Sequence, residues 1–420
     1  MKRKPLITTL LLAFSFSVFS PIASIAKAEE LPKIPSTESA ITMDYETGEI
    51  IYAKNADEKR YPASTTKLLT GLLFAENKQK TDKIAYSEEA KKQPQYSLNT
   101  NFKPQPVGST MTADDVMKAL LLYSANDAAY MVADAVSGNS KAFSDLMNKK
   151  AKEIGMNNSH FITPNGLHNP DHYSTAYDLT ILGRDAFKNP WEREVMETKK
   201  SRIILGDGSI IYIENRNLGL GIDGNLGGKT GTTTEAGHCL VAVYERNGKK
   251  IVGTVLNAPR DNKTVFEQMN KIMDYSYSAK RVPIYKTGYQ VKKIDLKYKP
   301  FGFFGPEKTI QVPLDLTEDV MAYDNPINKE ATKLDVATTN VSAWKLATHN
   351  DMLKLTVKER IYHKNYNLKA NISIWTLIKA NLVIYVISLV VIVAIVVLII
   401  LIINLIKKGR SRKRSGMRFR

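Results

Sequence analysis

The chain has 420 residues, of which 43% are hydrophobic and 24% are charged, so it has the composition of a globular protein with room for two or three domains. Its formal net charge of +17 would suggest nucleic-acid binding, but twelve of the basic residues lie at the two ends. Four are in the first 28 residues and eight are in the last 14, and neither stretch contains an acidic residue. The middle of the chain is only mildly basic, so we expect no nucleic-acid partner.

Residues 1–28 have the three parts of a secretory signal peptide: a basic start, an apolar run over residues 6–19, and small residues at Ala26 and Ala28. The apolar run is short and is followed by Pro21, which disfavours a membrane-spanning helix. We expect cleavage after Ala28. The single cysteine, Cys239, lies in an apolar strand pattern, so the exported chain depends on its core rather than on an internal disulfide.

Residues 382–406 are 25 consecutive residues without a charge, mostly Ile, Val and Leu. At about 1.5 Å per residue, a helix of this length exceeds the roughly 30 Å hydrocarbon core of a bilayer. The segment is therefore predicted to cross the cell membrane once. By the positive-inside rule the basic tail, residues 407–420, is cytoplasmic and residues 29–381 lie outside the cell.

The first structured region is predicted to be a β-hairpin over residues 41–53, followed by a buried helix that begins near Pro62 and contains the apolar run 68–74. Residues 76–110 are polar and rich in turn-forming residues, and we expect a long connection over the surface. Thr112 has the position of a helix cap before an apolar run over 116–122. Two more helices are predicted, 128–136 and 141–154, and Ser124 and Asn126 lie at the junction before the first of them.

Residues 157–173 are irregular and contain His160, His168 and His172. Their spacing matches no common zinc signature, so we expect no metal and interpret the segment as a loop beside a cleft. After this loop, a hairpin is predicted over 202–213. Strands over 227–232, 239–244 and 251–256 predict an antiparallel sheet with one covered face.

Composition changes at residues 281–283, which predicts that a first domain occupies residues 29–283. Residues 284–368 contain short strand-like runs, such as 309–314 and 352–357, and predict a small β-rich domain. Residues 369–381 would then form a stalk that leads into the predicted spanning helix.

Ser64-Thr65-Thr66-Lys67 is the first stretch that suggests chemistry. On a helix, Ser64 and Lys67 share a face and lie within reach of each other. A lysine in a dry site can lose its charge and accept the serine proton, and the start of a helix favours developing negative charge. The motif alone is also compatible with a capped helix start and a solvated lysine.

Two further motifs follow in order: Ser124-Ala125-Asn126 and Lys229-Thr230-Gly231. With Ser64-x-x-Lys67 they make the chain resemble the penicillin-binding serine peptidases, specifically the low-molecular-mass D-alanyl-D-alanine carboxypeptidases. The resemblance extends through the sequences at 61–67, 124–129, 165–167 and 235–237, and covers most of residues 35–285. Lys229-Thr230 could also suggest a phosphate-binding loop, but Asp223 stands where that motif requires glycine.

The resemblance implies an α/β (α+β) fold of the serine β-lactamase and penicillin-binding-protein type, with an antiparallel sheet and a helical subdomain. It implies that Ser64 is the nucleophile and Lys67 the base. Ser124 would relay a proton to the leaving amine with help from Lys229, and Asn126 would orient the substrate amide and Lys67.

By the same resemblance, residues 229–232 (Lys229, Thr230, Gly231 and Thr232) bind the substrate, with its terminal carboxylate at Lys229, Thr230 and Thr232. Backbone N–H groups of Ser64 and Thr232 would form the oxyanion hole. The implied reaction removes the terminal D-alanine from peptidoglycan stem pentapeptides through an acyl-enzyme on Ser64, without a cofactor. β-Lactams should acylate the same serine.

Two features depart from the family pattern. Gly228 stands where a bulkier apolar residue is expected, and the anchor is predicted to span the membrane instead of lying on it. Three alternatives remain: a DD-endopeptidase, a non-catalytic peptidoglycan-binding protein, and a β-lactamase. A class A β-lactamase needs a deacylating glutamate on a loop before the Lys-Thr-Gly strand, and residues 157–187 contain none.

Overall fold

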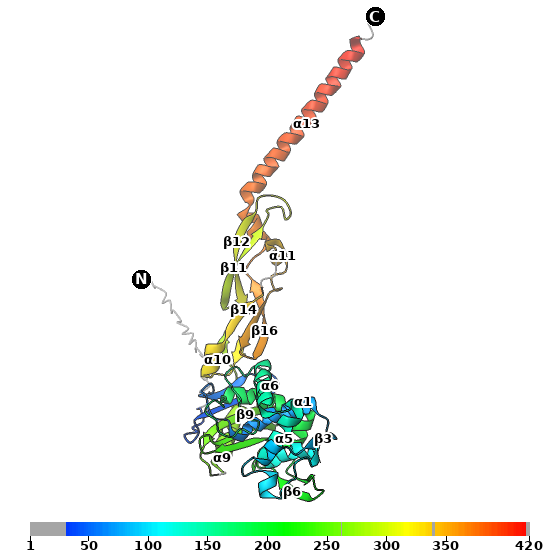
Figure 1. The fold of residues 1–420 in the computed structure, drawn as a ribbon. Helices are drawn as coiled ribbons and strands as arrows, with labels where there is room; N and C mark the ends of the chain where they lie inside the picture. The colour runs from blue at the N-terminus through cyan, green and yellow to red at the C-terminus, as the bar shows by residue number, and fades with distance from the viewer. Residues whose placement is uncertain (1–30, 262, 338–340, 417–420) are drawn as a thin grey trace, which may run out of the picture. The chain divides into compact units, whose positions relative to one another are not determined.

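The computed structural model describes residues 31–261, 263–337 and 341–416 (Figure 1). The predicted signal peptide, residues 1–28, lies outside the described residues. Residues 32–281 contain a five-stranded antiparallel sheet and most of the described helices, and residues 282–370 contain a second five-stranded sheet.

The first sheet has the strand order β2-β1-β9-β8-β7. Its strands are β1 Ser39–Asp44, β2 Ile50–Lys54, β7 Asn225–Thr233, β8 Gly237–Arg246 and β9 Lys249–Ala258. The predicted hairpin over 41–53 is confirmed by the pairing of β1 with β2. Strand β7 lies at an edge of this sheet, so one side of its backbone is not paired with another strand of it.

Both faces of this sheet are covered, and the prediction of one covered face was wrong. In β8, Val241 and Val243 belong to the core formed with the helical part of the molecule. Leu240 and Tyr244 belong to a second core, which includes Met269 from α9 Thr264–Ser278. Helix α9 covers the second face, and β8 therefore lacks the alternation of buried and exposed residues that a half-covered strand shows.

The helical part is built around α1 Lys67–Asn77, whose residues from Lys67 to Phe74 are all buried. The surrounding helices are α4 Ala113–Lys118, α5 Asn126–Ser137, α6 Ser140–Glu153, α7 Ala176–Lys188 and α8 Pro190–Met196. The predicted cap at Thr112 is confirmed, because its side chain accepts a hydrogen bond from Asp115 N. The start of α1 is therefore buried within this helical part.

The chain enters α1 through a 3₁₀ turn, η1 Ala63–Thr66, which places Ser64 immediately before the helix. Strand β7 lies against this turn at Gly231. A Cβ atom on residue 231 would lie 2.7 Å from Ser64 N, so only glycine allows this approach. The Lys-Thr-Gly strand is thereby held beside the serine.

Residues 76–110 are more ordered than the predicted surface connection. They contain β3 Lys83–Ala85, α2 Glu88–Lys91 and α3 Leu98–Asn101, and β3 pairs with β4 Thr110–Thr112. Buried Asp127 in α5 holds this segment by accepting hydrogen bonds from Tyr86 Oη, Leu98 N and Asn99 N, each at 3.0 Å. The prediction failed because this buried acceptor lies far from the segment in sequence.

The hairpin predicted over 202–213 is confirmed as β5 Lys200–Ile204 and β6 Ile210–Glu214. The second sheet has the order β11-β12-β16-β15-β14, with β11 Gln290–Tyr298, β12 Lys308–Leu316, β14 Lys333–Val336, β15 Lys354–Glu359 and β16 Tyr362–Ala370. It has its own core, which includes Leu314, Leu355 and Leu368. The β-rich region after residue 283 is therefore present.

The smaller elements of this region are β10 Val282–Tyr285, β13 Val320–Ala322, α10 Pro326–Ala331, α11 Ala343–Thr348 and α12 Ile374–Ala380. The last helix is α13 Leu382–Gly416. Within its part Leu382–Gly409, the most apolar stretch of 18 residues has a mean hydropathy of 3.8 and no buried residue, so this part of the helix is long and apolar enough to cross a membrane.

Candidate active site

Lys67 is the centre of the candidate site. Its side chain is fully buried, and Nζ donates hydrogen bonds to Ser64 Oγ at 2.9 Å, Asn126 Oδ1 at 2.9 Å and Asn165 O at 2.8 Å. Three of the predicted residues, Ser64, Lys67 and Asn126, are thus directly connected. Asn165, from the loop before α7, is an additional partner that the sequence did not indicate as part of the site.

The partners of Lys67 define how a neutral amine would be oriented. Asn165 O can only accept a hydrogen bond. Asn126 Nδ2 donates to Gln95 O at 2.9 Å, which assigns Oδ1 as the atom that faces Lys67. These two acceptors take two N–H groups. In the neutral amine, the lone pair is then left to face the Ser64 hydroxyl, which is the geometry that a general base requires.

The electrostatic environment favours the neutral amine. Burial lowers the pKa of Lys67 well below its ordinary value, and the positive charges of Lys229 and Arg216 lower it further. Burial, together with the charge of Arg216, lowers the pKa of Lys229 to about 7. Lys67, Lys229 and Arg216 therefore form a cationic cluster in which the two lysines readily lose their protons, and a bound anion would favour the protonated form of Lys229.

Ser124 is positioned by unusual backbone geometry. It follows a π-helical turn, η2 Ala119–Tyr123, and has a φ of 73°, in the left-handed region that few residues other than glycine adopt. Asn126, two residues later, begins α5, and its backbone N–H donates to Tyr96 O at 2.7 Å. The predicted junction between helices is confirmed, and the strain stored at Ser124 is typical of functional positions.

The remaining predicted residues lie on β7. Lys229 is buried and its Nζ donates to Thr230 O at 3.1 Å, while Thr232 is exposed. Position 228 requires glycine for a steric reason, because a Cβ atom there would lie 2.1 Å from Val241 O in the neighbouring strand. Gly228 therefore follows from the close pairing of β7 with β8.

The loop with the three histidines forms part of the wall around Lys67. His172 Nδ1 accepts hydrogen bonds from Ile162 N and Thr163 N, both at 3.2 Å, so the neutral ring carries its proton on Nε2 and donates it to Thr66 Oγ1 at 3.0 Å. Burial lowers the pKa of His172 to about 3, which keeps the ring neutral. His172 therefore fastens the loop to η1.

Arg216 is a residue of the site that sequence reasoning missed. Its guanidinium carbon lies 4.5 Å from the centroid of the Tyr96 ring and 4.8 Å from that of Tyr123, the residue before Ser124. Its backbone N–H donates to Leu122 O at 3.2 Å. Two aromatic faces thus hold this cation close enough to influence both lysines. No motif marks Arg216, because its partners come from distant parts of the chain.

Replacing Arg216 with glutamine is expected to shift the acidic limb of the pH profile of kcat/KM upward, by on the order of 0.5 to 1 pH unit. The reason is that removing a positive charge raises the pKa values of Lys67 and Lys229, so less neutral amine is present at a given pH. Arg216→Lys is the matched control, because it keeps the charge and should retain a limb close to that of the wild type. An unchanged limb in Arg216→Gln would contradict this electrostatic role.

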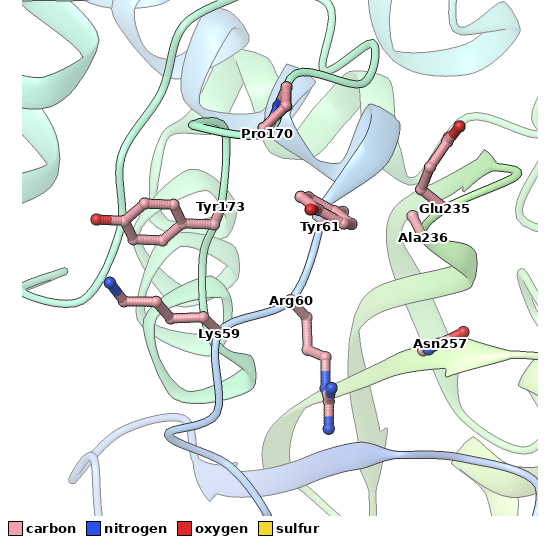
Figure 2. Close-up of a pocket in the computed structure, with 8 residues that line it drawn as sticks. All are labelled: Lys59, Arg60, Tyr61, Pro170, Tyr173, Glu235, Ala236 and Asn257. Carbon is pink, nitrogen blue, oxygen red and sulfur yellow. The ribbon is translucent and has the colours of Figure 1, made fainter.

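A hollow of about 260 Å³ lies beside η1, around Tyr61. Figure 2 shows Lys59 and Tyr173 on one side of Tyr61, and Glu235 and Ala236 on the other. Lys59 Nζ lies 4.1 Å from the centroid of the Tyr173 ring. The hollow is therefore lined by aromatic surface and carries opposite charges on its two sides.

The antiparallel sheet, the helical part around α1 and the serine–lysine–asparagine cluster together define a serine acyl-transfer enzyme of the penicillin-binding type. A model of the D-alanyl-D-alanine carboxypeptidase family matches residues 25–260. The chain belongs to this family.

Individual relatives agree with the family model. D-alanyl-D-alanine carboxypeptidase DacF of Bacillus subtilis is 30% identical over 356 residues, which cover 81% of this chain and 87% of the relative. DacC of Escherichia coli is 32% identical over 281 residues, which cover 63% and 67% of the two chains. The crystal structure of the Streptomyces K15 DD-transpeptidase matches with a TM-score of 0.53 and 31% identity, over 60% of this chain and all of that one.

Proposed function

We propose that this chain is a membrane-anchored serine D-alanyl-D-alanine carboxypeptidase in which Lys67 activates Ser64. The observation that carries the proposal is the contact of 2.9 Å between Lys67 Nζ and Ser64 Oγ, in a site where two other acceptors fix the amine. The family membership supports the same activity. The substrate is a peptidoglycan stem peptide that ends in D-Ala-D-Ala.

In the acylation step, neutral Lys67 accepts the proton of Ser64 Oγ as this oxygen attacks the carbonyl between the two D-alanines. Backbone N–H groups of Ser64 and Thr232 stabilise the oxyanion of the tetrahedral intermediate. The intermediate collapses, the bond to the terminal D-alanine breaks, and the leaving amine takes a proton by way of Ser124 and Lys229. Water then hydrolyses the ester on Ser64 and releases the shortened peptide.

The cationic cluster supports a substrate with a terminal carboxylate. Lys229 lies buried on β7, and its pKa of about 7 reflects burial beside a positive charge without a matching anion. A bound carboxylate would supply the counter-charge and favour the protonated amine, while the hydroxyls of Thr230 and Thr232 would donate to its oxygens.

From the direction of β7 we infer that the other half of the substrate lies in the hollow around Tyr61. If the terminal carboxylate lies at Lys229 and Thr230 and the scissile carbonyl at Thr232, the upstream peptide runs toward Glu235. The hollow there, with Lys59 and Glu235 on opposite sides, suits a long side chain with a charged end.

Lys59→Ala is expected to lower kcat/KM for a full stem peptide about two- to fivefold, because an exposed charge contact is lost. Hydrolysis of an acylated D-Ala-D-Ala dipeptide, which is too short to reach the hollow, should not change. Lys141→Ala, which removes an exposed lysine in α6, is the matched control. An equal effect of Lys59→Ala on both substrates would contradict the assignment of the hollow.

The three alternatives make different products. A DD-endopeptidase would cleave a cross-linked peptide dimer faster than a pentapeptide, and a non-catalytic protein would release no D-alanine. A β-lactamase would need a carboxylate that can reach water in the cleft. Glu192, the first glutamate after the histidine loop, is fully buried against Gly71, and burial raises its pKa well above its ordinary value. The experiment is therefore to compare D-alanine release from a pentapeptide with cleavage of a cross-linked dimer and of a β-lactam.

We further place the residues before 382 outside the cell and the basic tail in the cytoplasm, with residues 29–283 as the catalytic domain and 284–368 as a β-rich domain between it and the membrane. Apolar helix α13 and its basic C-terminal flank support this topology. Protease added to intact cells should digest the catalytic domain and spare a tag at residue 420; the opposite pattern would refute the orientation.

A further inference from the structure

A cluster of exposed aromatic side chains lies in the β-rich region and is not explained by catalysis. The loop between β11 and β12, residues 299–307, contains Phe303 and Phe304, whose side chains are 89% and 68% exposed. In the same loop, the ring of Phe304 packs against that of Phe301, with centroids 6.3 Å apart. We call this loop the aromatic loop. Large apolar side chains gathered in this way usually mark a surface that binds protein or lipid.

The aromatic loop is attached to the beginning of the apolar helix α13. Tyr385, in the first turn of that helix, donates a hydrogen bond through its hydroxyl to Pro300 O at 2.6 Å. The rings of Tyr385 and Phe301 pack edge to face, with centroids 5.2 Å apart. The loop therefore has a defined position along the axis of α13, next to its first turn.

The segment between α12 and α13 is also fixed to the β-rich sheet. Asn381 Nδ2 donates to Tyr298 Oη, the last residue of β11, at 2.9 Å. Asn381 is itself buried, and Leu377 in α12 lies in the core of the β-rich region. The segment 369–381, predicted to be a stalk, is thus packed against the sheet, and a single residue, Asn381, separates α12 from α13.

The position of the loop on α13 sets its depth in a bilayer, given the membrane anchoring proposed above. The charge-free part of α13, residues 382–406, has 25 residues and would be about 38 Å long, which exceeds the roughly 30 Å hydrocarbon core. The first turn of α13 is therefore expected at the level of the lipid headgroups. Aromatic residues are enriched at this level, because their rings favour the boundary between the apolar core and water.

We propose that the aromatic loop, with Phe303 and Phe304 at its tip, inserts into the outer interface of the membrane beside α13. The occupant of the patch is a lipid bilayer, and this assignment rests on the contact of the loop with the first turn of the spanning helix. Two exposed lysines nearby, Lys299 and Lys379, suit anionic headgroups. The β-rich region is thereby attached to the bilayer at two points, which limits its tilt and holds the catalytic domain at a set orientation.

The test uses the full-length chain in liposomes of phosphatidylcholine and phosphatidylglycerol, labelled with the fluorophore NBD at one introduced cysteine. Phe303→Cys places the label at the tip of the loop, Ile392→Cys places it within α13, and Tyr212→Cys places it on β6, where the native tyrosine is 79% exposed. Native Cys239 is fully buried and should not react with the label. Wild-type protein treated with the same reagent is the control for this.

Lipids that carry a doxyl quencher near the headgroup are expected to quench the label at position 303 at least several-fold more than the label at 212. The emission at 303 should also move to shorter wavelength. Label 392 should be quenched by lipids with the doxyl group deep in the chain, which confirms the anchor independently. If the label at 392 is quenched but the label at 303 gives a fully aqueous signal, the aromatic-loop proposal is overturned and the anchor stands. The same result is expected if the patch binds a protein instead of lipid. A label at 392 that no lipid quenches would overturn the anchor and the loop insertion together.

Discussion

Ser64→Ala should lower kcat for D-alanine release by about 10⁴-fold or more and should abolish the covalent adduct with penicillin. The cause is direct, since Ser64 Oγ is the atom that we propose forms the acyl bond in both reactions. The variant should remain folded, because Lys67 keeps its hydrogen bonds to Asn126 and Asn165 after the hydroxyl is removed. The measurement is the rate of D-alanine release from a stem pentapeptide.

Ser140→Ala, at the start of α6, is the matched serine control and should retain wild-type turnover. Equal melting temperatures of the wild type and both variants would exclude unfolding as the cause. Measurable turnover by Ser64→Ala through an acyl-enzyme would show that another residue is the nucleophile.

Lys67→Arg should lower the rate of acylation by about 10²- to 10⁴-fold, the range typical of the loss of a general base. Arginine keeps the positive charge but cannot lose a proton in a protein, so it cannot accept the proton of Ser64. The result separates the two roles that a lysine can have in this cleft: a base or only a cation. The measurement is the acylation rate with a chromogenic β-lactam from pH 5 to pH 9.

Lys67→Gln is a second variant, in case the larger arginine disturbs the buried site, and it should be equally slow. Lys229→Arg is the comparison on β7: it keeps the charge that binds the carboxylate but cannot pass a proton toward the leaving amine, so we expect its effect mainly in kcat. Wild-type acylation by Lys67→Arg would contradict the assignment of Lys67 as the base.

The pH at which the acylation rate begins to rise is expected to be lower than for an ordinary lysine base. Burial and neighbouring cations lower the pKa of Lys67, so the neutral base is present at lower pH than a free lysine would allow. Activity should therefore rise through an acidic limb well below pH 10. Loss of Arg216 should move this limb to higher pH, because it removes one of the two positive charges that lower the pKa of Lys67.

The local parts of the site could be predicted from sequence because short-range chemistry defines them. The three-residue spacing of Ser64 and Lys67 predicts their contact, and the structure has it at 2.9 Å. The position of Ser124 between two helices follows from capping signals. The glycine of Lys-Thr-Gly is explained by the close approach of β7 to the Ser64 backbone.

The parts that could not be predicted depend on contacts between distant segments. Asn126 is fixed by the carbonyls of Gln95 and Tyr96, and backbone carbonyls leave no trace in a sequence pattern. Arg216 reaches the site only because Tyr96 and Tyr123 meet around it. The predicted single covered face of the sheet was wrong for the same reason, since helix α9 returns to the sheet from the end of the domain.

The most direct test of the central claim is the intact mass of the full-length chain after addition of benzylpenicillin, with Ser64→Ala alongside and D-alanine release measured in parallel. The account predicts a single adduct that persists, maps to Ser64 and is absent from Ser64→Ala, together with D-alanine release by the wild type that benzylpenicillin blocks. Consumption of benzylpenicillin without an adduct or D-alanine release would instead identify a β-lactamase. A chain that forms no adduct and releases no D-alanine would contradict the account.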